Sequence, residues 1–187
     1  IAFSDKTTIP MYLNCDNPVI KQLDDMRLFP INQPPTLKLT ESLGGSLSAG
    51  TYYVTINYER NDGTTTQYSE FSDGITLPPG DVGTITDKAI LITITNADLN
   101  YNFIRVSIVS KVNGKTKAIE LNDPVPVAGS TVEILFTGDN LSTDIEISEL
   151  LTPRAIYNKV NAIGQLNDSL YLGGLEKEDE IIDMQQY

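Results

Sequence analysis

The hydrophobic residues between positions 50 and 59 fall at every second position. They are Tyr52, Val54, Ile56 and Tyr58, and polar Thr55, Asn57 and Glu59 lie between and after them. Side chains of a β-strand alternate between its two faces, so this spacing predicts a strand with one buried face and one wet face.

A turn signal follows this strand at once. Asn61-Asp62-Gly63 supplies residues that tolerate the positive φ angles of a tight hairpin. The chain then runs through a β-branched and aromatic stretch, residues 64–68, which we expect to form the return strand. Ile75 and Leu77 can complete it. The sequence therefore predicts a β-hairpin here.

The same alternation recurs along the middle of the chain. We predict strands at residues 36–43, at 88–95 and at 103–108; Ile90, Ile92 and Ile94 share one face of the second, and Ile104, Val106 and Ile108 point inward in the third, with Arg105 and Ser107 outward. After the Asn113-Gly114 turn we predict a return strand at 118–121. Two more strands are predicted, one at 132–136 with Val132, Ile134 and Phe136 alternating, and a last short one at Ile145 and Ile147. Short strands with regular turn signals and no helical period predict an all-β fold, an antiparallel β-sandwich. An up-and-down barrel fits the same pattern, although its strands are usually longer and more even.

The flanks differ from this middle region. Five prolines fall in the first 35 residues, namely Pro10, Pro18, Pro30, Pro34 and Pro35. Proline blocks helices and removes a donor, so residues 1–34 should form an extended arm or linker, with one short helical turn around residues 19–26. The arm lies either across a neighbouring molecule or against its own domain.

A further hairpin is predicted beyond Pro153. Val160 to Leu166 lead to Asn167-Asp168, and Leu170 to Leu172 follow. We therefore expect three parts: the arm at 1–34, a β-sandwich domain at 35–150, and the start of a second, incomplete β domain at 151–187. Both ends look cut from a longer polypeptide, so we expect the chain to be a fragment.

Composition narrows the function. The net charge is −12, which makes nucleic acid an unfavourable partner because phosphates attract Lys and Arg. The sequence has no His, the commonest general base and transition-metal ligand, and its single cysteine, Cys15, is interpreted as a packing or surface residue. No stretch approaches the eighteen or so apolar residues of a membrane span, so no membrane partner is expected.

Two candidate binding features remain. Asp139 and Asp144, with Asn140 and Thr143 between them, could wrap a calcium ion with side-chain oxygens or could form a plain solvated turn. Tyr53, Tyr68 and Tyr101 could form a sugar-binding platform, although packing within or across strands is the commoner role of such tyrosines. We expect no enzyme activity, and no catalytic, cofactor-binding or metal-binding residue.

Two stretches carry a resemblance. Gly50-Thr51-Tyr52-Tyr53-Val54, with Asp62-Gly63 and Gln67-Tyr68-Ser69-Glu70, resembles the strand-hairpin-strand of fibronectin type III-like domains. The later order of Ile90–Ile94, the turn at 96–101, Ile104–Val109 and Ala162–Leu172 resembles the muzzle or stabilisation proteins in the tails of crAss-like bacteriophages. The similarity covers residues 48–175.

This resemblance implies a function as well as an Ig-like or fibronectin III-like fold. It implies a multi-copy structural component of the virion, around the tail channel of a phage that infects gut Bacteroidetes, with other virion proteins and copies of itself as partners. It carries over no catalytic residue. The alternative is an Ig-like module of a surface or adhesion protein that binds a glycan or a receptor.

Overall fold

The computed structural model describes residues 2–3, 9–12, 26–27, 33–61, 63–77, 84–152, 157, 159–166 and 169–176. The chain divides into two compact units, one formed by Asn32–Pro153 and one formed by Ile1–Ile31 together with Arg154–Tyr187. The predicted boundaries at residues 34 and 150 stay a prediction. Cys15 and residues 19–25 of the predicted helical turn lie outside the described residues.

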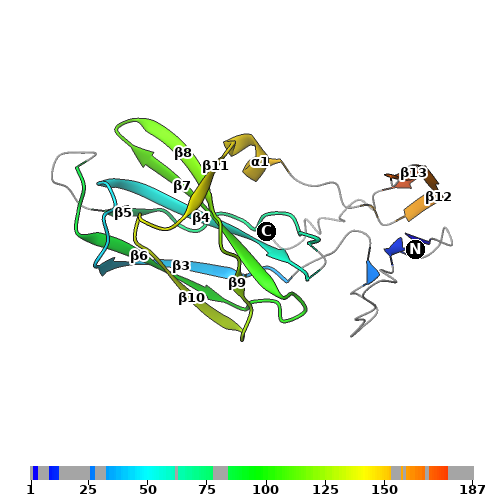
Figure 1. Cartoon of the computed structure of the whole chain (residues 1–187), viewed down its shortest axis with the longest axis horizontal. Helices are drawn as coiled ribbons and strands as arrows, with labels where there is room; N and C mark the ends of the chain where they lie inside the picture. The colour runs from blue at the N-terminus through cyan, green and yellow to red at the C-terminus, as the bar shows by residue number, and fades with distance from the viewer. Residues whose placement is uncertain are drawn as a thin grey trace, which may run out of the picture. The chain divides into compact units, whose positions relative to one another are not determined.

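The unit Asn32–Pro153 is a sandwich of two antiparallel sheets (Figure 1). The small sheet has the order β10-β6-β3, and the large sheet has the order β11-β8-β7-β4-β5, with β9 also paired to β7. The strands are β3 (Thr36–Leu43), β4 (Gly50–Glu59), β5 (Ile75–Leu77), β6 (Lys88–Thr95), β7 (Phe103–Val112), β8 (Lys115–Leu121), β9 (Val125–Pro126), β10 (Thr131–Phe136) and β11 (Ser142–Ile145). This confirms the all-β sandwich, and two separate sheets exclude the single barrel.

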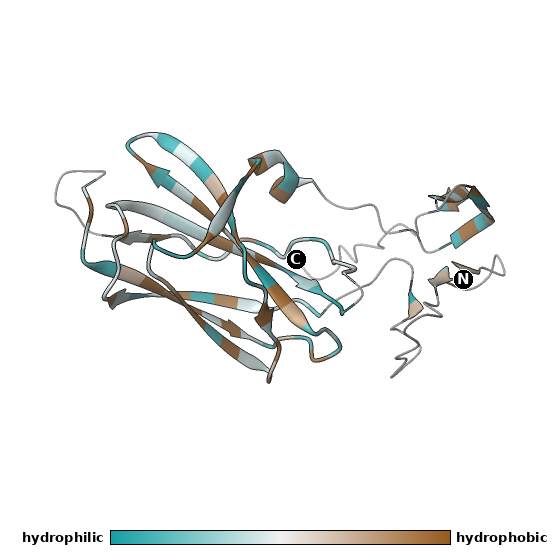
Figure 2. Cartoon of the chain, viewed as in Figure 1, coloured by the Kyte–Doolittle hydropathy of each residue, from teal (hydrophilic) through white to brown (hydrophobic). Residues whose placement is uncertain are grey.

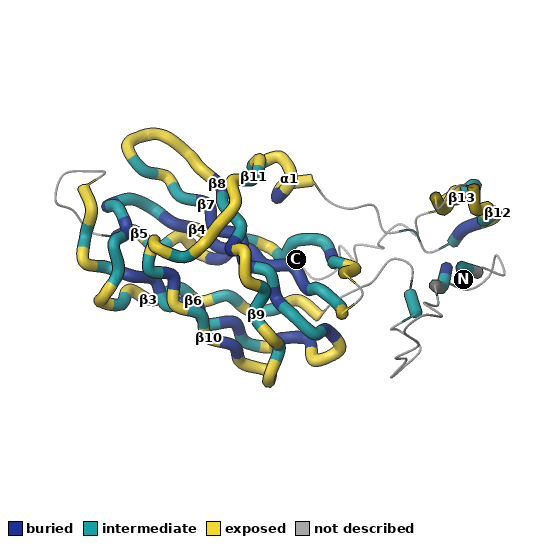
Figure 3. The backbone as a smooth tube through the Cα atoms, in the orientation of Figure 1, coloured by how far each residue is buried: buried dark blue, intermediate teal, exposed yellow. Residues whose placement is uncertain are grey.

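The alternating hydrophobic positions form the core between the two sheets. Tyr52, Ile56, Ile92 and Val106 are each at most 4% exposed. Figure 2 shows apolar positions recurring along the sheet strands, and Figure 3 shows that burial concentrates in the centre of the sandwich. Since burial of one such side chain stabilises the fold by about 1.5–3 kcal/mol, this core is the main source of stability.

The predicted hairpin turn at Asn113-Gly114 is confirmed. Asn113 and Gly114 have φ angles of 51° and 71°, as a two-residue hairpin between β7 and β8 requires. The hairpin predicted near the C-terminus is present as β12 (Lys159–Leu166) paired with β13 (Ser169–Glu176). The remaining described strands, β1 (Ala2–Phe3) and β2 (Met11–Tyr12), pair with each other.

The predicted return strand after Gly63 is wrong for residues 64–68. Only an isolated bridge joins Glu59 to Thr65, and regular pairing with β4 resumes at β5, where Ile75 lies opposite Tyr52. From Thr66 onward, Thr66, Ser69 and Ser72 of this return segment are spaced three residues apart, whereas a regular strand has a period of two. The segment therefore follows β4 without matching its register.

The last predicted strand is also partly wrong. Ile145 ends β11, but Ile147 begins α1 (Ile147–Leu151), a single helical turn. Ile147 and Leu150 are three residues apart, and one helical turn directs both into the same small apolar cluster. In an extended strand, Ile147 and Leu150 would point to opposite faces, so the packing of both in one cluster explains why the chain forms a helical turn here.

The wet face predicted for β4 is buried. Thr55 and Asn57, on the face opposite to the core, are 0% and 3% exposed. Ser107, predicted to point outward from β7, is 0% exposed as well. The two faces of β4 and β7 alternate as predicted, but other parts of the chain also cover the outer face of the large sheet.

Candidate functional site

The outer face of the large sheet is covered by the return segment, residues 64–74, which we call the strap. The strap runs antiparallel to β4 and hydrogen-bonds to alternate residues of that strand. Three strap residues make the same pair of bonds, one through the backbone N–H and one through the side-chain hydroxyl. The strap N–H donates to the strand carbonyl at 2.9 Å from Thr66 to Tyr58, 2.7 Å from Ser69 to Ile56 and 2.8 Å from Ser72 to Val54. In return, the strand N–H donates to the strap hydroxyl oxygen at 3.0 Å from Tyr58 to Thr66, 3.1 Å from Ile56 to Ser69 and 3.0 Å from Val54 to Ser72.

This hydroxyl ladder replaces a regular strand. Each of these β4 residues donates its N–H to a strap Oγ and accepts a hydrogen bond from a strap N–H at its carbonyl oxygen, so both backbone groups at this edge are satisfied. The strap advances three residues for every two on β4. A hydroxyl at every third strap position therefore keeps the pairing in phase, which is why Thr66, Ser69 and Ser72 have this spacing.

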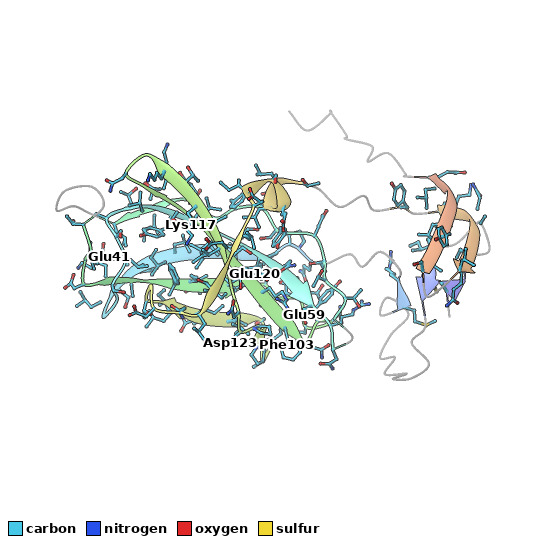
Figure 4. The ribbon with its side chains drawn as sticks, turned by 45° about the horizontal axis from the view of Figure 1, so that its top comes forward. Glu41, Glu59, Phe103, Lys117, Glu120 and Asp123 are labelled. Atoms are coloured by element: carbon cyan, nitrogen blue, oxygen red, sulfur yellow. The ribbon has the colours of Figure 1, made fainter. Side chains whose placement is uncertain are left out.

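A charged network lies on the same outer face. Arg105 on β7 donates through Nε to Glu59 on β4, and through a terminal nitrogen to Glu120 on β8 at 3.0 Å. The strap joins it, because the Tyr68 hydroxyl donates to Glu120 at 3.3 Å. The hydrogen bond to Glu59, with that to Glu120, raises the pKa of the Arg105 guanidinium. Figure 4 labels both glutamates, on β4 and β8.

This network fits a structural role better than a chemical one. The Arg105, Glu59 and Glu120 side chains are 30%, 14% and 19% exposed, so the charges are partly withdrawn from water and are held by each other. Charge-assisted bonds from one guanidinium to two neighbouring strands fix the three central strands of the large sheet. The arrangement can hold β4, β7 and β8 together, and both carboxylates are engaged in doing so.

A second apolar cluster completes the cover. Val109, Ala118 and Leu150 are buried together, with Tyr68, Phe71, Ile145 and Ile147 packed against them. The strap contributes two aromatic rings and α1 contributes two aliphatic side chains. This cluster explains why the polar residues beneath the strap are inaccessible to water.

The three candidate tyrosines do not form one platform. Tyr101 is 3% exposed and its ring stacks on Tyr58 with centroids 5.0 Å apart, so it packs in the core and does not join a sugar-binding platform. Tyr68, which belongs to the strap, is half-buried and bonded to Glu120. Tyr53 is 36% exposed, with its ring beside Gly74, where a Cβ would lie 2.6 Å from the Tyr53 ring.

The two carboxylates of the candidate calcium loop have separate protein partners. Asp139 accepts a hydrogen bond from the Ser46 hydroxyl at 3.1 Å, whereas Asp144 pairs with Lys117 at 2.8 Å. Asn140 closes the turn that begins at Thr137, because its side-chain oxygen accepts from the Thr137 N–H at 2.9 Å. In the part of the chain that the structure describes, no group of three or more acidic or Cys side chains could hold a metal ion.

An open surface that the sequence analysis did not single out is the outer face of the small sheet. Strand pairing places its side chains in three rows, which are Thr36, Thr95 and Thr131, then Lys38, Thr93 and Glu133, then Thr40, Leu91 and Leu135. We call these nine residues the threonine face. Its side chains are exposed or half-buried, and Leu135 is 43% exposed. The sequence signal was threonine at positions on one face of two strands, residues 36 and 40 in the first and residues 93 and 95 in the second.

Other exposed apolar side chains lie on the β12–β13 hairpin. Leu166, Tyr171 and Leu175 are 61%, 58% and 36% exposed. By strand alternation and pairing, all three share one face of this two-stranded sheet. Solvent-exposed apolar residues on a small sheet are typical of contact surfaces.

Comparison with known proteins gives the family. A sequence profile described as Crassvirus muzzle protein matches residues 3–187, nearly the whole chain. A search of curated proteins finds no match. Among the described residues, no helix has the length and apolar character needed to cross a membrane. The match confirms the resemblance seen in the sequence, and we conclude that the chain belongs to the Crassvirus muzzle protein family.

Proposed function

We propose that this chain is a multi-copy component of the crassvirus tail and that it acts through protein–protein contacts. Family membership supports a structural role in the virion and is the observation that carries the proposal. We infer that the chain is present in several copies and lies in the tail because it belongs to the muzzle protein family. The partners are other virion proteins and further copies of this chain.

The side chains of the sandwich support a role without catalysis. Glu59, Glu120 and Arg105 hold three strands together, and Asp139 and Asp144 are engaged by Ser46 and Lys117. These groups stabilise a β-sandwich whose proposed task is to present surfaces to neighbouring molecules. In this proposal the chain neither makes nor breaks bonds in a substrate.

The two uncovered surfaces supply the contacts. The threonine face and the apolar face of the β12–β13 hairpin are both accessible, whereas the strap and α1 cover the outer face of the large sheet. The proline-rich arm, residues 1–34, is proposed to lie across a neighbouring subunit, because an arm of this composition cannot offset its ordering entropy alone.

Cross-linking mass spectrometry of purified virions tests this proposal. We expect lysine cross-links that join peptides of this chain to tail proteins and to a second copy of the chain, and none to the shell of the head. A chain missing from purified particles, or cross-linked only to head proteins, would contradict the tail proposal.

A further inference from the structure

The threonine face is a neutral surface on a strongly acidic molecule. The chain has a net charge of −12, so two copies repel each other over most approaches. The threonine face carries one lysine and one glutamate and no other charged side chain. The threonine face therefore adds no excess of negative charge to the repulsion between two copies.

Its two charges do not neutralise each other within the sheet. Lys38 on β3 and Glu133 on β10 share a row with Thr93 between them. Two strand spacings separate them by about 10 Å. In the described residues neither charge has an ion-pair partner. Each is available to an opposite charge on another molecule.

We propose that the threonine face binds the same face of a second copy, about a two-fold axis that runs along β6. This inference rests on the proposed function, in which copies of the chain contact one another. It adds the surface, the symmetry and the residues of that contact.

The charge pattern selects the direction of the axis. An axis parallel to the strands places β3 of one copy over β10 of the other, so each Lys38 lies over Glu133 of the second copy. An axis across the strands would place Lys38 over Lys38 and Glu133 over Glu133. Only the first arrangement is electrostatically favourable, because like charges in contact oppose association.

The same axis matches the uncharged rows. Leu91 lies over Leu91 of the second copy, and each Leu135 lies over Thr40 of the other chain. The apolar residues thus meet at the centre of their row, and threonine methyl groups cover its ends. Isologous contacts of this kind are self-complementary by definition.

Edge-to-edge pairing of the small sheets is the less favoured arrangement. Lys38 and Glu133 are each the third residue of an edge strand, β3 and β10 respectively. Charged side chains at such positions are how natural sheets discourage the addition of a further strand. The open face is therefore a better candidate than either edge.

The contact is small. Three strands of up to eight residues cover about 14 Å by about 27 Å, or about 400 Å² on each copy, which is about half of a standard interface. We expect a weak dimer in dilute solution and a stable contact at the high local concentration inside a virion. Covalent trapping is therefore a better assay than dilution.

The test uses the full chain with its single cysteine removed by Cys15→Ser. In this background, Thr93→Cys places a thiol on the axis, and a short bis-maleimide joins two such thiols across stacked sheets that lie about 10 Å apart. Thr116→Cys, exposed on β8 of the large sheet, is the matched control. We expect dimers to form at least about tenfold faster at position 93, and equal rates would overturn the inference.

Charge reversal adds a second readout. Lys38→Glu or Glu133→Lys alone should reduce trapping at position 93 by about tenfold, and the double variant should restore it. Each variant should melt at the wild-type temperature, since both side chains are exposed. Trapping between Lys38→Cys and Glu133→Cys chains without trapping at position 93 would indicate edge pairing and overturn the face-to-face contact.

The two proposals fail separately. If virions contain several copies of the chain but position 93 is not trapped, this contact is wrong and the proposed function stands. If the chain is missing from virions, the proposed function is wrong whatever the trapping shows.

Discussion

The hydroxyl ladder leads to a sharp prediction about Thr66. This residue is 1% exposed, and its Oγ1 accepts the Tyr58 N–H at 3.0 Å. Thr66→Val keeps the shape and volume of the side chain but removes the acceptor. The Tyr58 N–H is then buried without a hydrogen-bond partner, so we expect the variant to be less stable.

The size of the effect follows from the geometry. A buried donor that loses its partner costs about 1–3 kcal/mol, and because valine fills the same space no cavity cost is added. The melting temperature of a unit of this size should fall by roughly 3–5 °C for each kcal/mol. Thr66→Ser keeps the hydroxyl and loses one methyl group, so its loss should be smaller, about 1 kcal/mol.

Urea denaturation and amide hydrogen exchange measure this together. We expect a lower urea midpoint at an unchanged slope for Thr66→Val, and faster exchange of the Tyr58 amide than in Thr66→Ser. Thr116→Val, on an exposed position of β8, is the control and should stay within about 0.5 kcal/mol of the wild type. Wild-type protection of the Tyr58 amide in Thr66→Val would refute the ladder as the reason for the threonine.

Three further predictions concern the core, high pH and the C-terminal hairpin. Ile92→Ala, at a position that is 0% exposed, should cost about 2–5 kcal/mol by urea denaturation, and a loss below about 1 kcal/mol would contradict its place in the core. Burial raises the pKa of the Tyr52 phenol above 10.0, so the folded state holds this proton more tightly than the unfolded chain does. Stability should therefore be intact below about pH 10 and fall above it, and in Tyr52→Phe the decline should be weaker, as urea midpoints across this range will show. Hydrogen bonds from Asn161 and Lys159 lower the pKa of Glu176, so Asn161→Ala should raise that pKa toward 4.5 in an NMR titration, whereas an unchanged value would contradict the bond.

The core could be predicted because its signal is local. Alternation of Tyr52, Val54, Ile56 and Tyr58 sets the faces of β4 whatever its neighbours are. The Asn113-Gly114 turn likewise needs only the tolerance of these two residues for positive φ. Both features depend on a few adjacent residues, so a sequence is sufficient to find them.

The cover of the large sheet could not be predicted in this way. Thr55 and Ser107 look like wet positions because they are polar, and their burial depends on the strap and α1, which come from other parts of the chain. Thr66, Ser69 and Ser72 repeat strictly every three residues, which matches neither the two-residue period of a strand nor the 3.6-residue period of an α-helix, so the usual patterns pass over them. Here tertiary contacts decide the structure.

The two uncovered surfaces could be predicted only in part, because their residues are visible in the sequence but their arrangement is not. Threonine at alternate positions fits any strand with a wet side, so Thr93 and Thr95 give no warning of a special surface. The neutrality of the threonine face becomes visible only when strand pairing brings Lys38 and Glu133 into one row. Register is what turns separate polar residues into a candidate interface.

Electron microscopy of the intact virion is the most direct test of the central claim, that this chain is a structural part of the tail. We predict density for several copies of the sandwich, with strands β3 to β11, arranged around the tail and in contact with neighbouring subunits. A reconstruction that accounts for the whole tail and contains no such sandwich would contradict the claim.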